Sequence, residues 1–164
     1  MATRSTIALE FADGTVEQIY CHWDGYLEHN GQILLKHYSN PFVLRDLIDG
    51  GAVSSLGQKV GTKHPFSKFE IDALSPNFEQ LVAQVQQADE QGFTTFYARD
   101  RGEELVKHRF KDYADYKANA QSEEYNYILR TDGKWYVEFY GEFDGLLEQA
   151  IMDEQDAKAQ EETA

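Results

Sequence analysis

Alternating apolar and polar residues predict two β-hairpins. Residues 6–11 alternate in this way, and after Asp13-Gly14 the alternation resumes over residues 16–20. Asp-Gly is a strong signal for a tight hairpin turn, because glycine adopts positive φ without steric strain. A similar pattern returns nearer the C-terminus, where residues 125–129 and 135–140 flank a turn at 131–134. Each pair predicts two antiparallel strands.

Helical periodicity and capping residues predict further elements. Asn40 and Pro41 suit the N-cap and the first position of a helix. Ser75-Pro76 repeats that signal before apolar residues at i, i+3, i+4 and i+7 spacing. Residues 93–98 have the pattern of a strand, while residues 52–56 and 103–110 fit either a helix or a strand. The predicted helices cover residues 27–38, 42–49, 75–91, 111–121 and 146–158.

Together these elements predict an α+β fold in a single domain. We expect a mainly antiparallel sheet, built from the two hairpins plus a further strand, with about four helices packed on one face. The domain is expected to span residues 1–157, and residues 158–164 to form a frayed acidic C-terminal tail. A chain of 164 residues is long enough to bury a core without disulfides.

The charge of the chain is strongly negative and unevenly distributed. The net charge is −14, and from Glu138 to the C-terminus nine acidic residues accompany Lys158 alone, so this segment carries −8. Direct binding to nucleic acid is disfavoured, because phosphate binding requires clustered Lys and Arg. An acidic surface either keeps a protein in solution or steers it to a basic partner.

Composition also bears on the cellular compartment. The N-terminus lacks the apolar region of a signal peptide, and no apolar run approaches the roughly 20 residues needed to span a bilayer. Cys21 is the only cysteine, so an intramolecular disulfide is excluded and a reducing compartment fits best. These features predict a cytoplasmic protein without membrane association, and they leave its oligomeric state open.

Residues 20–31 concentrate side chains that could form a ligand site. His22 and Asp24 lie two apart, so both point to one face of a strand; a hydrogen-bonded surface pair is the alternative. Arginine beside tyrosine in residues 97–101 could hold an anionic or planar ligand, and an ion-paired turn is the alternative there. The side chains of this candidate ligand site are His22, Trp23, Asp24, Tyr26, Arg99 and Arg101.

Catalytic and metal chemistry have less support in the sequence. Cys21, His22, Asp24 and His29 could meet at the strand-to-helix turn, but their spacing matches no recurrent zinc pattern. No nucleophile elbow, phosphate loop or dinucleotide fingerprint is present. We therefore assign no catalytic residue and expect no cofactor and no bound metal. A metal-assisted hydrolase at these four residues is kept as a third hypothesis.

The acidic residues of the C-terminal part predict a protein-binding surface. A helix rises about 1.5 Å per residue, so acids every two or three residues approximate the charge density of DNA. A solvated helix face with a disordered end is the alternative. The residues of this candidate acidic surface are Glu138, Glu142, Asp144, Glu148, Asp153, Glu154 and Asp156.

Several short segments point to a known family. They are His22-Trp23-Asp24-Gly25-Tyr26 followed by His29-Asn30-Gly31, residues 33–35, residues 52–56 and residues 97–103. With these segments the chain resembles a family of small uncharacterised proteins found in bacteriophages and prophages. The resemblance covers roughly residues 1–105 and the second hairpin. It implies a phage accessory protein and brings no assigned catalytic residues.

This resemblance and the acidic charge lead to one functional expectation and one alternative. Small acidic phage proteins often inhibit host defence, so by analogy we expect a non-enzymatic protein of the host cytoplasm. It would bind and inhibit a basic host protein, of which a nucleic-acid-processing defence enzyme is an example. The alternative is a protein that binds a small nucleotide signal at the candidate ligand site.

Overall fold

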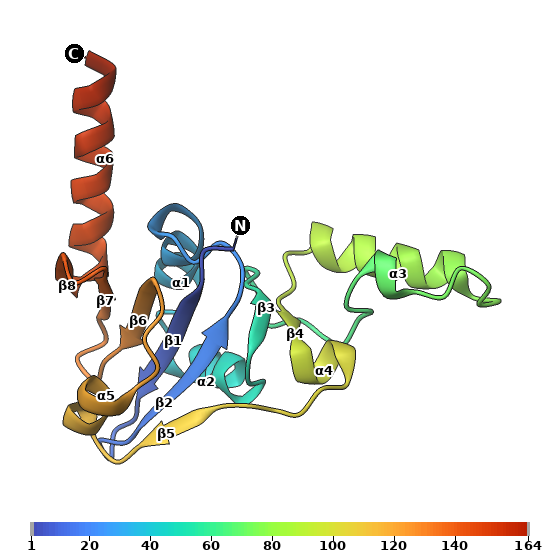
Figure 1. The fold of residues 1–164 in the computed structure, drawn as a ribbon, viewed down its shortest axis with the longest axis horizontal. Coiled ribbons are helices and arrows are strands. Elements are labelled where there is room, and N and C mark those ends of the chain that lie inside the picture. The colour runs from blue at the N-terminus through green and yellow to red at the C-terminus, as the bar shows by residue number, and fades with distance from the viewer. Residues whose placement is uncertain (1, 164) are drawn as a thin grey trace.

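The computed structural model describes residues 2–163, and its strands and helices are interspersed along the chain (Figure 1). The strands are β1 (Ser5–Glu10), β2 (Val16–Cys21), β3 (Val53–Ser55), β4 (Thr95–Phe96), β5 (His108–Phe110), β6 (Tyr125–Leu129), β7 (Trp135–Phe139) and β8 (Phe143–Leu146). The helices are α1 (Gln32–His37), α2 (Pro41–Asp49), α3 (Phe78–Glu90), α4 (Tyr97–Arg101), α5 (Tyr113–Asn119) and α6 (Leu147–Thr163). Two further turns are the π-helical η1 (Leu27–Gly31) and the 3-10 helix η2 (Lys68–Glu70).

Both predicted hairpins are present. β1 pairs antiparallel with β2, and β6 pairs antiparallel with β7. The turn residues Gly14 and Gly133 have φ values of +93° and +78°. These angles favour glycine, because residues with a side chain rarely adopt positive φ. The local turn signal in the sequence therefore identified each hairpin correctly.

The complete sheet is larger than expected and mixed rather than purely antiparallel. It has eight strands in the order β4-β3-β2-β1-β6-β7-β8, and β5 pairs with β2 off this path. Most neighbours are antiparallel, but β1 runs parallel to β6 and β2 parallel to β3. The two hairpins lie side by side through their first strands, which run in the same direction. The prediction missed this long-range pairing and the strand β8, whereas β4 lies within the predicted strand 93–98 and β3 lies within residues 52–56, which fitted either a helix or a strand.

Helices cover both faces of the sheet, which corrects the expectation of about four helices on one face. Within residues 2–163 there are six α-helices. η1, α1, α2 and the start of α6 pack on one face around a core that includes Ile7, Leu44 and Tyr127. α5 covers part of the other face, where Tyr116 packs with Ala8, Val16, Phe110 and Ile128.

Two segments differ from the predicted elements. Residues 93–98 were expected to form one strand, but only Thr95–Phe96 is extended, and α4 begins at Tyr97. The final helix starts after β8, a strand that the sequence analysis did not predict. α6 continues to Thr163 and so passes residue 158, where a frayed tail was expected to start. None of the helices within residues 2–163 is both long and apolar enough to cross a membrane.

Two elements extend away from the sheet. α3 and the segment before it form an arm on one side, and α6 rises as a rod on the other (Figure 1). The apolar residues of α3 match the predicted helical spacing, yet Phe78, Leu81, Val82 and Val85 are only half-buried. Only the first turns of α6 contribute to the core, through Leu147, Ala150 and Ile151.

Candidate functional site

The segment between β2 and η1 is a tight turn fixed against the N-terminus. Asp24 has a φ of 56°, in the left-handed region. The Gly25 amide donates to the carbonyl of Thr3 at 2.8 Å. A Cβ atom at Gly25 would lie 2.7 Å from the Cβ of Ser5, so only glycine fits this approach of the two chain segments.

Asn30 holds this turn together from inside the protein. Its side-chain amide nitrogen lies 3.3 Å from Ser5 Oγ, Cys21 Sγ and the Trp23 carbonyl oxygen. His29 Nδ1 donates to Asn30 Oδ1 at 2.8 Å. Asn30 is fully buried, with 0% of its surface exposed. The local sequence gives no signal for this role of Asn30, because the contact with Ser5 joins residues 25 positions apart along the chain.

The aromatic part of the candidate ligand site lies at the surface of this turn. His22 Nδ1 is 2.7 Å from the Tyr20 hydroxyl, and its ring meets the Trp23 ring edge-on at 4.7 Å between centroids. Trp23 and Tyr26 are exposed, and Asp24 is half-exposed. Among residues 2–163, these side chains share no hydrogen bond or ion pair with Arg99 or Arg101, the remaining members of the site.

The side chains proposed for a metal site, Cys21, His22, Asp24 and His29, do not form a metal-binding cluster. Across the part of the chain that the structure describes, no three His, Cys, Asp or Glu residues are grouped to hold a metal ion. Cys21 is buried, and its thiol donates to the Trp23 carbonyl at 3.7 Å. Burial raises the pKa of this thiol to about 11. A neutral thiol is a poor ligand, because metals bind the thiolate.

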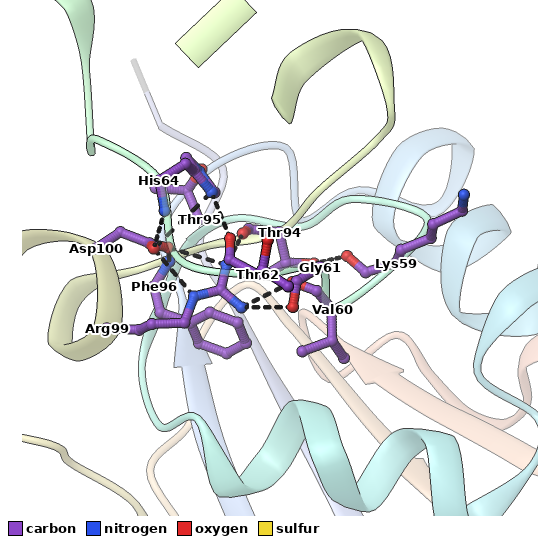
Figure 2. Close-up of polar contacts among 10 residues, drawn as sticks. All are labelled: Lys59, Val60, Gly61, Thr62, His64, Thr94, Thr95, Phe96, Arg99 and Asp100. Carbon is purple, nitrogen blue, oxygen red and sulfur yellow. Dashed lines mark hydrogen bonds and ion pairs between the residues drawn. The ribbon is translucent and has the colours of Figure 1, made fainter. Parts of the chain in front are cut away.

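Arg99 forms a buried ion pair with Asp100 that joins three segments (Figure 2). Its Nε and Nη2 donate to the two carboxylate oxygens of Asp100 at 3.0 and 3.1 Å. Nη2 also donates to the Thr94 carbonyl, and Nη1 donates to the carbonyls of Val60 and Gly61. These contacts engage all the N–H groups that a guanidinium has. Arg99 therefore connects the 60–64 segment to β4 and presents no free donor to a ligand.

Asp100 and His64 complete this network (Figure 2). The Asp100 carboxylate, which is 0% exposed, also accepts from the backbone amides of His64 and Phe96. His64 Nδ1 lies 3.0 Å from the Thr62 carbonyl oxygen and donates to it, and Nε2 lies 3.1 Å from the Thr95 hydroxyl. Arg99 was among the predicted site residues, whereas His64 and the buried role of Asp100 were not predicted.

A cavity of about 610 Å³ adjoins His64, beneath α3. Phe66, Phe93 and Val85 supply apolar walls, while Thr95 and Lys68 add polar groups. Arg101 lies nearby but is occupied by carboxylates, since its Nε is 2.5 Å from Glu103 and Nη1 is 3.6 Å from Glu70. The guanidinium of Arg101 also stacks over the Phe66 ring.

The candidate acidic residues divide into two groups. Glu138 accepts from the Asn126 side chain, and Asp144 pairs with Lys117 at 2.8 Å, so both take part in local structure. Glu142 is exposed in the turn before β8. The other four lie on α6, where all but the half-buried Glu154 are exposed: Glu148, Asp153, Glu154 and Asp156.

Comparisons of the chain with known protein families, with curated proteins and with solved structures found no match.

Proposed function

We propose that the chain is a non-enzymatic phage accessory protein that binds and inhibits a basic host protein, with α6 as the contact element. The supporting observation is the exposure of acids on a helix that projects from the body (Figure 1). Among the described residues, Glu148, Asp153 and Asp156 have no ion-pair partner, whereas Lys158 pairs with Glu28 and Glu154. A partner can therefore reach these three carboxylates.

The spacing of charge along α6 supports a partner that binds nucleic acid. Six acidic residues lie between Glu148 and Glu162, a distance of about 21 Å along a helix axis. This is about one charge per 3.5 Å, close to the phosphate spacing along one DNA strand. Because α-helical residues advance by about 100° each, the acids point in several directions. Such a rod fits a positively charged groove better than a flat surface.

Affinity capture from host lysate tests the proposal. The immobilised protein would be washed in low salt and eluted with a salt gradient, and the eluted proteins would be identified by mass spectrometry. We expect a basic nucleic-acid-processing protein to elute at moderate salt, because screening weakens contacts between exposed charges. Its activity should fall when the chain is added. Absence of any salt-eluted basic protein would contradict the proposal.

A charge-matched pair of triple variants tests the role of α6. The first variant neutralises Glu148, Asp153 and Asp156. The control neutralises three exposed acids elsewhere, Asp46, Glu79 and Glu104, and so has the same net charge. We expect the α6 variant to associate with the partner about tenfold more slowly at low salt, and the control to resemble the parent protein. Equal rates for the two variants would show that only overall charge matters and would refute the role of α6.

A further inference from the structure

A second cavity, independent of α6, lies where both hairpins meet the start of α2. Its volume is about 460 Å³, within the range of roughly 300–1,000 Å³ that small-molecule sites occupy. The buried side chains of Leu9 and Leu129 form its floor, and Phe11 and Phe42 form apolar walls. This cavity is outside every site that the sequence analysis considered.

The apolar walls of this cavity are unusually open to solvent. Phe42 is 79% exposed although it begins an amphipathic helix. Phe11 is only half-buried. An exposed aromatic ring beside a preformed apolar floor is characteristic of a surface that gains stability when a ligand covers it. A ligand with an apolar body would therefore remove both rings and the floor from water.

The rim of the cavity is positively charged, in contrast to the chain as a whole. Arg45 is 61% exposed, and its closest carboxylate is Asp49 at 3.9 Å. Asp49 is also bound by Lys107 at 3.1 Å, so it neutralises Arg45 only in part. The guanidinium of Arg45 lies 5.6 Å from the centre of the Phe11 ring. A charged donor thus stands next to an apolar wall.

Arg130 adds a second guanidinium, which is held rigidly. Its Nε and Nη2 donate to Glu10 at 3.1 Å each, and its Cζ lies over the Tyr113 ring, 3.5 Å from the ring centre. Nη1 has no partner among the described residues. Glu10 is the only carboxylate among the lining residues, and it also accepts from the amide and hydroxyl of Thr131. The carboxylate is therefore satisfied internally, and the cavity retains a net positive charge.

We propose that this cavity binds a small molecule that carries one anionic group on an apolar body, such as an aliphatic or aromatic carboxylate. The anionic group pairs with Arg45 and with the free side of Arg130, and the apolar body covers Leu9, Leu129 and the two phenylalanines. The N-terminus of α2, where Pro41 and Phe42 line the cavity, contributes a favourable partial positive charge. A cation would be disfavoured by the same groups.

Titration calorimetry with three ligands that share the same alkyl chain tests this proposal. The ligands are decanoate, decanol and decylamine, which differ only in the charge of the head group. We expect decanoate to bind with a single site, and decanol and decylamine to bind at least about tenfold more weakly, because only the carboxylate forms charge-assisted hydrogen bonds with the guanidinium groups. Equal affinity for decanol and decanoate, or no binding of decanoate, would overturn the proposal.

Two variants locate the binding and separate its charged and apolar parts. Arg45→Gln should weaken decanoate binding about tenfold and leave decanol unaffected. Phe42→Ala should weaken both ligands. Both side chains are exposed, so folding is preserved, and Arg109→Gln on the exposed part of β5 serves as the control. Decanoate affinity that is equal in Arg45→Gln and Arg109→Gln would place the binding elsewhere and refute the site.

Discussion

The Arg99–Asp100 pair gives the sharpest test of how the arm is attached to the sheet. The variant Arg99→Met keeps the length of the side chain but removes its charge and five hydrogen bonds. Asp100 then remains as a fully buried carboxylate with only two backbone amides as donors. Breaking a buried ion pair by removing one partner costs about 3–5 kcal/mol. We expect a loss of about 3 kcal/mol, at the lower end, because Arg99 is 22% exposed and water can replace part of its contacts.

Urea unfolding followed by tryptophan fluorescence measures this loss, and Arg101→Met provides a matched control in the same helix. Arg101 pairs with Glu103 and Glu70 at the surface, so its replacement should cost less than about 1 kcal/mol. A double variant that adds Asp100→Asn to Arg99→Met removes both charges. It should be less destabilised than the sum of the single variants, by about 0.5–3 kcal/mol.

Two results would refute this reasoning. The first is a loss below about 1 kcal/mol for Arg99→Met, which is the value for a surface pair. The second is strict additivity in the double variant, because residues in one hydrogen-bonded network are expected to show coupling. Hydrogen exchange adds a spatial check: the amides of residues 59–64 and 94–96 should exchange faster in Arg99→Met, while β6 and β7 should change little.

Three further predictions concern stability and reactivity. Burial raises the pKa of Glu10, but hydrogen bonds from Arg130 and Thr131 outweigh burial and lower the pKa below its usual value of 4.5. The stability that results is present above pH 4.5 and is lost as the pH falls through the lower pKa of the folded state. Glu10→Gln should therefore reduce the fall of the urea midpoint at acid pH, and an unchanged acid dependence would contradict this. Cys21, whose pKa burial raises to about 11, should react with a thiol reagent only after denaturation, and rapid reaction of the native protein would disprove its burial. A Cβ atom at Gly57 would lie 2.2 Å from the Gly92 carbonyl oxygen, so Gly57→Ala should cost about 1–3 kcal/mol in thermal unfolding, and an unchanged midpoint would be inconsistent with this contact.

The elements that the sequence predicted well are those with local signals. Asn40 accepts from the Phe42 amide at 2.9 Å, so the predicted cap of α2 is present. The hairpins follow from their turn residues in the same way. The strand β8 has only four residues and contains Gly145, which removes one side chain from the alternating pattern. Its pairing with β7 provides the stabilisation that its composition lacks.

Long-range contacts explain why the sheet order and the site were harder to predict. The parallel pairing of β1 with β6 is accompanied by a hydrogen bond between Thr6 and Asn126, which are 120 residues apart. No periodicity within either strand specifies that partner. The same holds for Asn30, whose contact with Ser5 closes the turn beside Trp23. In each case a polar residue that looks ordinary in its local sequence is buried because its partner arrives from elsewhere in the chain.

The position of charge in the fold separates structural from available groups. Sequence spacing grouped Arg99 and Arg101 as ligand donors, but every donor of Arg99 is bound to protein acceptors (Figure 2). Nothing in the sequence around Arg45 indicates a site, because it lies within an ordinary amphipathic helix, yet its guanidinium is exposed beside an apolar cavity. A charged side chain can act on a ligand only if its hydrogen bonds are not already used within the protein. By that criterion we propose the start of α2 as the place where this acidic chain binds an anion, and the exposed acids of α6 as its contact with a basic protein.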